Sequence, residues 1–315
     1  MRLAFAAAIA CVTASAPVFA ETLKIAIPQK GNWETSITEM GMQAGLFKKE
    51  GLDLDIVYTE GGPQTVQAVV SGSVDVGMQN GLLGIIGAYA KGAPVRVVSA
   101  GMTGSPDLYF YATTASGIKS LKDADGKTIG FSGPGSSTDL VVRAALQQEN
   151  VKAKPTRTGG IPGTFTAVMS GQVDIGWAVP PFGLQDIKDG KIAIVFRGRD
   201  VKALADETVR VNIVGADTLK QKHDALVKFS KAYAESVDWV YQHDEALKFY
   251  ADMNHISIDM ARQTRDDFYP RPNVQYAEIK GLDKALQQAE EFKFIAKPMK
   301  PEDVSGMIDI LYKGK

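Results

Sequence analysis

Short apolar runs alternate with amphipathic stretches along the first two thirds of the chain. Runs at 23–27, 52–58 and 95–100 have the length of buried strands, and 37–49 has helical spacing. The alternation restarts near 108–112 and continues through runs at 128–131 and 192–196. Strands that alternate with helices build parallel sheets covered by helices. We therefore predict an α/β fold with mostly parallel sheets.

One segment of this pattern occurs twice. PQTVQAVVSGSVDVG at 63–77 returns as PGTFTAVMSGQVDIG at 162–176, and nine of the fifteen positions are identical. In each copy a proline suits the first helical position, and Gly72 or Gly171 suits a left-handed helix end. Each copy predicts one helix, turn and strand, so we expect two similar halves. The equivalent Asp75 and Asp174 are expected to make structural hydrogen bonds near the strand starts.

The remaining chain is mostly helical after a second crossover expected at 209–214. We predict helices at 219–253, 257–267 and 282–292 and a tail from 298. About 295 residues is large for one core. We expect a first lobe from 21–109 and 212–315, and a second lobe, 110–211, inserted into it. Two crossover strands would join the lobes and permit hinge closure, with Arg210 as a candidate hinge salt bridge.

The N-terminus has the pattern of a secretory signal peptide, 1–20. Arg2 precedes an apolar run at 3–12, and small residues end at Ala20. The run is shorter than the roughly 20 residues that span a bilayer. We expect cleavage after Ala20 and a periplasmic protein; an uncleaved anchor is the alternative. Lipoprotein attachment through Cys11 is disfavoured, because Ala8 lies where such sites usually have leucine.

Composition excludes several classes of chemistry. Cys11 is the only cysteine, and removal of Arg2 with the signal leaves 34 Lys+Arg against 36 Asp+Glu. This balance has no basic footprint for nucleic acid. The three histidines lie in the C-terminal helical part without metal-ligand spacing, and no P-loop, dinucleotide fingerprint or nucleophile elbow occurs. We predict a binding protein with no catalytic residue, metal or cofactor.

Candidate ligand contacts follow the expected strands. Ligands of open parallel sheets bind beyond the carboxyl ends of the strands, and there this chain has mainly amides, hydroxyls and indoles. The candidates are Gln29, Trp33, Gln79, Asn80, Ser132, Ser136, Ser137, Thr138 and Trp177. For the two tryptophans, ordinary packing is the alternative. For Gln79 and Asn80, the alternative is capping of the next helix.

The segment SGPGSST at 132–138 is the sharpest of these features. A glycine-rich turn that opens a helix presents free N–H groups and the positive end of the helix dipole, which favours an anion. Ser136 could instead cap the helix, with Asp139 as its partner three residues on, and both roles can coexist. Arg143 could approach the anion, although packing or solvation suits it better.

Several of these motifs resemble one known family. GLFKKEGLDLD at 45–55 is similar to the early signature of nitrate/sulfonate/taurine-type solute-binding proteins of ABC importers. SGSVDVG at 71–77 and SGQVDIG at 170–176 resemble the paired motifs of that family, and 121–131 before a Gly-Ser-Ser helix start also fits. The resemblance implies a type II periplasmic-binding-protein fold whose lobes close over a small-molecule ligand. It also implies transient docking on an inner-membrane ABC permease and contacts from the loops that hold Trp33, Gln79, Ser136, Ser137 and Trp177.

The expected function is capture of a small organic anion by a monomer. A sulfonate or carboxylate is favoured, and the tryptophans leave room for an aromatic body. A receptor for a pyrimidine precursor or another heterocycle, and a sensory ligand-binding protein, are the alternatives. An enzyme of the pyrimidine synthase type shares this fold, but it would imply an iron site and a cysteine-rich segment, which this sequence lacks.

Overall fold

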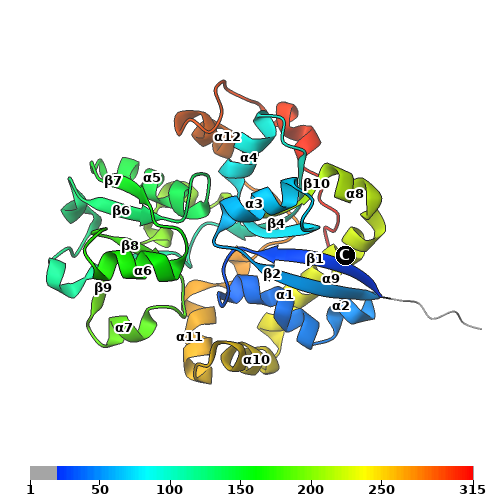
Figure 1. Cartoon of the computed structure of the whole chain (residues 1–315), viewed down its shortest axis with the longest axis horizontal. Helices are drawn as coiled ribbons and strands as arrows, with labels where there is room; N and C mark the ends of the chain where they lie inside the picture. The colour runs from blue at the N-terminus through cyan, green and yellow to red at the C-terminus, as the bar shows by residue number, and fades with distance from the viewer. Residues whose placement is uncertain (1–19, 315) are drawn as a thin grey trace, which may run out of the picture.

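The computed structural model describes residues 20–314, so the predicted signal peptide lies outside the described residues except for Ala20. The described chain forms two lobes side by side (Figure 1). The first lobe contains a five-stranded sheet in the order β2-β1-β3-β10-β4. Its strands are β1 (Glu21–Ile27), β2 (Leu52–Tyr58), β3 (Val76–Gly81), β4 (Val95–Thr103) and β10 (Thr208–Gly215).

The second lobe repeats this arrangement. Its strands are β5 (Tyr109–Thr113), β6 (Thr128–Phe131), β7 (Lys154–Arg157), β8 (Gly176–Ala178) and β9 (Ile192–Arg197). They pair as β8-β5-β9 and β6-β7. A parallel bridge between Ile129 and Ile175, the residue before β8, connects the two groups. The resulting order, β7-β6-β8-β5-β9, is equivalent to that of the first lobe.

Both sheets are mostly parallel, as predicted, and each contains one antiparallel strand. β1 pairs in parallel with β2 and β3, whereas β10 runs antiparallel to β3 and β4. In the second lobe β5 is likewise antiparallel to β8 and β9. The antiparallel strands are the ones that enter each sheet from the other lobe. β10 begins at Thr208, four residues before the expected return to the first lobe at 212.

Helices cover both sheets, and none in the described chain is long and apolar enough to cross a membrane. They are α1 (Trp33–Gln43), α2 (Leu46–Lys49), α3 (Gly62–Val70), α4 (Leu82–Ala90), α5 (Ser137–Glu149), α6 (Ile161–Met169), α7 (Leu184–Lys188), α8 (Ala216–Gln221), α9 (His223–Gln242), α10 (Asp244–Asn254), α11 (Ile258–Phe268) and α12 (Leu282–Glu291).

The single helix predicted at 219–253 is wrong, because this stretch forms parts of α8, α9 and α10. The backbone of His243 is extended, with φ −123° and ψ 124°, which ends α9. A straight helix of that length would reach about 50 Å. The break instead lets α10 turn back onto α9 and α1, where Leu247 and Tyr250 are buried.

The repeat folds as predicted, except that each proline is the second helical residue and not the first. Pro63 follows Gly62 at the start of α3 and Pro162 follows Ile161 at the start of α6, and Gly72 and Gly171 have φ of +72° and +74°. The predicted structural role of the two aspartates is also confirmed. Asp75 accepts a hydrogen bond from the backbone N–H of Lys24 at 2.9 Å, and Asp174 accepts one from that of Thr128 at 2.9 Å.

Candidate functional site

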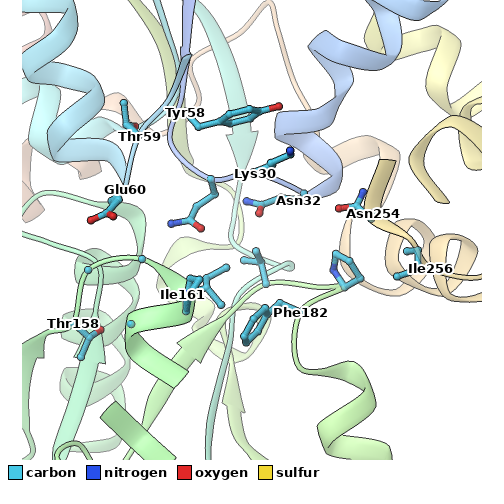
Figure 2. Close-up of a pocket in the computed structure, with 18 residues that line it drawn as sticks. Lys30, Asn32, Tyr58, Thr59, Glu60, Thr158, Ile161, Phe182, Asn254 and Ile256 are labelled. Atoms are coloured by element: carbon cyan, nitrogen blue, oxygen red, sulfur yellow. The ribbon is translucent and has the colours of Figure 1, made fainter. Parts of the chain in front are cut away.

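Two adjoining cavities lie between the lobes. The outer cavity has a volume of about 590 Å³ and the inner one about 40 Å³, and both are lined by Gln29, Asn32 and Val179. Figure 2 shows the outer cavity, where Tyr58 and Lys30 of the first lobe lie opposite Ile161 and Phe182 of the second. A ligand in this cleft would therefore contact both lobes.

The inner cavity collects most of the predicted contacts. Seven of the nine candidates line it: Gln29, Gln79, Ser132, Ser136, Ser137, Thr138 and Trp177. Gln29 and the turn hydroxyls follow β1 and β6, whereas Gln79 and Trp177, expected in loops, lie within β3 and β8 near their carboxyl ends. Whether these side chains bind a ligand stays a prediction, but the topological argument brings them to one place.

Trp33 and Asn80 line neither cavity. Trp33 begins α1 with none of its surface exposed. Its ring packs edge-on against the rings of Tyr250 and Tyr241, with centroid distances of 4.9 Å and 6.0 Å. Asn80 is also fully buried, and its Nδ2 donates to the carbonyl of Met78 at 3.2 Å. The structure thus places Trp33 in the core of the first lobe and Asn80 under the surface of the cleft.

The hydroxyls of the glycine-rich turn form one network. The Oγ of Ser136 caps α5 by accepting from the N–H of Asp139 at 3.2 Å. Thr138 Oγ1 lies 2.8 Å from Ser136 Oγ and 3.0 Å from Ser132 Oγ. Ser132, Ser136 and Thr138 have three hydroxyl hydrogens in all, and these two contacts use two of them. One hydroxyl hydrogen is therefore not used within this group of three. Ser137 Oγ accepts from Arg210 Nε at 3.0 Å, so its hydrogen is not used by that bond.

Three helices begin at the cleft without a side-chain cap. The residues at their N-cap positions, Asn32 of α1, Gly61 of α3 and Gly160 of α6, line the cavities. The first N–H groups of a helix have no partner within it and lie at the positive end of its dipole. Gly61 has φ +116°, which a residue with a side chain rarely adopts. These termini suit a negatively charged or carbonyl-bearing ligand.

A buried ion cluster, Glu34–Arg210–Asp107, lies at the inner end of the cleft. Arg210 Nη1 is 2.8 Å from Glu34 Oε1 and 2.7 Å from Asp107 Oδ2, and the three side chains are at least 95% buried. This confirms the predicted salt bridge of Arg210 at the crossover. Burial raises the pKa of Glu34 to about 7; the Arg210 charge counteracts the rise and Asp107 adds to it.

Sequence reasoning missed both acidic partners. Glu34 lies in the first turn of a helix, where acidic residues are common, and Asp107 lies in a short polar connection between β4 and β5. Neither has a local pattern that distinguishes it from a surface carboxylate. Arg143, by contrast, is packed as expected, with its Nε 2.7 Å from Asp139 Oδ1 and its guanidinium over the Phe294 ring.

Among the described residues, no group of three or more histidine, cysteine, aspartate or glutamate side chains could hold a metal ion. The lining side chains are chiefly amides, hydroxyls and apolar groups. The one acidic group that lines the inner cavity, Glu34, is engaged through one oxygen by Arg210. This composition can hold a small molecule by hydrogen bonds and apolar contact.

Comparison with known proteins gives a family match. A family model described as NMT1/THI5 like matches residues 38–246. A binding protein of Brucella abortus is 35% identical over 124 residues, which are 38% of this chain. The match spans only 35% of that relative's length.

Solved structures share the fold across nearly the whole chain. The alkanesulfonate-binding protein SsuA of Xanthomonas axonopodis has a TM-score of 0.74 at 17% identity, covering 94% of this chain and 99% of that one. The nitrate-binding protein NrtA of Synechocystis has a TM-score of 0.72 at 13% identity, covering 92% and 86%. The predicted periplasmic-binding fold and the predicted resemblance are therefore confirmed.

Proposed function

This chain belongs to the NMT1/THI5-like family, and from that membership we propose that it is the solute-binding protein of an ABC importer. The observation that carries the proposal is the inner cavity, which is lined together by the carboxyl ends of strands, and the loops that follow them, from both lobes. A solute that contacts both lobes binds the closed form more tightly and shifts the population toward it. The closed form would then dock, as a periplasmic monomer, on a permease in the inner membrane.

The solute we favour is a small organic anion, a sulfonate or carboxylate. Three uncapped helix N-termini, the unused hydroxyl hydrogens and Lys30 favour negative charge in the cleft, and Glu60, which also lines the outer cavity, opposes it. The outer volume of about 590 Å³ falls within the range of small-molecule sites. Ile161 and Phe182 would cover an aromatic or aliphatic body. A heterocycle is the second candidate, because Trp177 supplies an indole at the inner end.

A thermal-shift screen tests the ligand class. A ligand that binds only the native state raises its stability by mass action. Organic sulfonates and carboxylates should raise the melting temperature in a concentration-dependent way. If only compounds without an anionic group do so, the anion assignment is wrong, and mass spectrometry of co-purified ligand would then identify the class directly.

Replacement of the turn hydroxyls tests the site. Ser137→Ala removes one hydroxyl donor, so affinity for the best anion should fall about 2- to 10-fold. The double variant with Ser136→Ala should lose more affinity and also about 1 kcal/mol of stability, because Ser136 caps α5. Ser257→Ala is the matched control, since Ser257 caps α11 and lines neither cavity. Full affinity in the double variant would remove the hydroxyls from the site.

A further inference from the structure

Three residues that line the inner cavity have a buried side-chain polar atom without a hydrogen-bond partner: Oε2 of Glu34, Oε1 of Gln79 and Nε1 of Trp177. Gln79 Oε1 lies close to Gly101 inside the first lobe, which leaves Glu34 Oε2 and Trp177 Nε1, one from each lobe, as the pair considered for a ligand. Only 1% of Glu34 and 3% of Trp177 is exposed, and both residues line the cavity. A buried polar atom without a partner costs free energy. One acceptor and one donor thus lie unsatisfied where the two lobes meet.

The charge beside Glu34 does not favour an anion there. Arg210 is the cation of the ion cluster, and its side chain already contacts Glu34, Asp107 and Ser137. One guanidinium faces two carboxylates, so the cluster carries a net charge of −1 when both are ionised. A group that donates hydrogen bonds is therefore favoured beside Glu34. The anionic end of a solute is favoured beside the turn hydroxyls or Lys30, away from Glu34 and from Glu60, which also lines the outer cavity.

The volumes limit what can reach this point. A cavity volume of about 10–15 Å³ is enough for one water molecule. The inner cavity, with a volume of about 40 Å³, therefore holds a group of roughly three or four heavy atoms. The body of a larger solute must remain in the outer cavity. The inner end therefore selects a small polar head group.

We propose that Glu34 and Trp177 recognise a head group that carries an N–H donor beside an acceptor, such as a primary amide or the amidine edge of a heterocycle. Glu34 Oε2 accepts from the N–H, and Trp177 Nε1 donates to the neighbouring oxygen or ring nitrogen. The assignment rests on the proposed function in one respect, that a solute occupies the cleft. The solute would then have two chemically different ends, an anionic group and a head group that donates a hydrogen bond.

Glu34 is the group near this site whose charge changes around neutral pH. Its raised pKa of about 7 comes chiefly from burial. Arg210 and Asp107 face it, and buried tyrosines interact with its charge: Tyr233, Tyr241, Tyr250 and Tyr269. Burial raises the pKa of each tyrosine above its ordinary value, so all four stay neutral. Protonation places a hydrogen on the Glu34 carboxylate and removes its negative charge. Binding of a head group that donates an N–H should therefore weaken as the pH falls below about 7.

The test uses acetamide and acetate, which have the same shape but differ in the N–H donor. The chain has three tryptophans, so their indole N–H signals are few in an NMR spectrum, and Trp177→Phe assigns the relevant one. Acetamide should shift the Trp177 signal saturably, and acetate should not. Trp239, whose ring stacks on His243 away from the cleft, is the internal control.

Two variants separate recognition from bulk charge. Glu34→Gln should weaken acetamide binding about tenfold, because a charged acceptor is replaced by a neutral one. Asp107→Asn removes the same charge from the same cluster, but Asp107 does not line the cavity, so binding should change less than twofold. Equal weakening in both variants would overturn the proposal, as would the absence of a saturable acetamide shift or an equal response to acetate.

The unmodified protein provides a second readout that does not depend on how the variants fold. Acetamide should bind more weakly at pH 6 than at pH 8, because Glu34 takes up a proton over that range. A constant affinity would contradict the role of Glu34. Since acetamide carries no anionic group, this result is independent of the organic-anion screen, and either can fail alone.

Discussion

The two copies of the repeat use the same contacts for the same purpose. The hydroxyls of Thr59 and Thr65 lie 2.6 Å apart, and their equivalents Thr158 and Thr164 lie 2.7 Å apart. Each pair ties the loop that precedes the helix to its first turn. Together with the paired glycines and aspartates, these contacts form a frame that holds helix against strand in both lobes.

The copies differ where the frame ends. The residue after the glycine that both copies share (Gly77 or Gly176) is Met78 in the first lobe, which is buried in the core, and Trp177 in the second, which lines the inner cavity. The first lobe instead contributes Gln79, whose φ of +52° is unusual for a residue with a side chain. The equal parts position the cleft, and the unequal residues Gln79 and Trp177 line its inner cavity.

The largest expected effect concerns the buried ion cluster, which has no equivalent in the repeated frame. Arg210→Met would leave Glu34 and Asp107 buried without their cation, and breaking a buried pair in this way costs about 3–5 kcal/mol. Urea unfolding should show this loss. Lys127→Met removes a half-exposed partner of Asp174 and should cost less than about 1 kcal/mol.

Removing the charges together should recover much of that loss. A triple variant, Arg210→Met with Glu34→Gln and Asp107→Asn, leaves no unpaired buried charge and should be more stable than Arg210→Met alone. If Arg210→Met and Lys127→Met cost the same, the cluster is not the special feature of the hinge that the geometry indicates.

Local pattern and topology explain how much could be predicted. The strands, the repeat and the loops at the strand ends follow from periodicity and from glycine and proline positions, and they located seven lining residues. The ion cluster was beyond this reasoning, because Arg210 and Glu34 are 176 residues apart. The burial of Trp33 depends on α9 and α10 folding back onto α1, which the continuous helical pattern at 219–253 concealed.

A smaller effect tests the equality of the two frames directly. A Cβ on Gly77 would lie 2.8 Å from Val69 Cγ2, and one on Gly176 would lie 2.7 Å from Val168 Cγ2. Overpacking of this kind costs about 1–3 kcal/mol. Gly77→Ala and Gly176→Ala should each lower the free energy of unfolding by this amount, measured in urea.

The second of these variants should be the worse. Tyr111 Cζ also lies 2.9 Å from the added atom at Gly176, and its ring yields less easily than a methyl group. Gly215→Ala is the matched control, because its nearest contact is an ordinary 3.4 Å, and it should cost less than about 1 kcal/mol. A larger loss at Gly77 than at Gly176 would show that the frames are not packed alike.

The smallest expected effect is the contribution of Asp174 to stability, which we compare with that of its equivalent, Asp75. Burial opposes ionisation of Asp174, but hydrogen bonds from Thr128 and the Lys127 charge outweigh it and lower the pKa of Asp174. A lowered pKa means that the ionised group stabilises the fold above its ordinary value of about 3.9, and that this contribution is lost as the pH falls through the folded value. The side chain is 37% exposed, so the contribution should be below about 1 kcal/mol.

Asp174→Asn should therefore be less stable than the unmodified protein at pH 7, and the gap should narrow toward pH 3. Urea unfolding at both pH values measures it. Asp75→Asn is the paired variant: Asp75 is bonded to Lys222 at 2.9 Å and its side chain is only 15% exposed. Because the ion pair is better shielded from solvent, its loss at pH 7 should exceed that of Asp174→Asn. A gap for Asp174→Asn that stays constant with pH would mean that its hydrogen bonds act through geometry and not through charge.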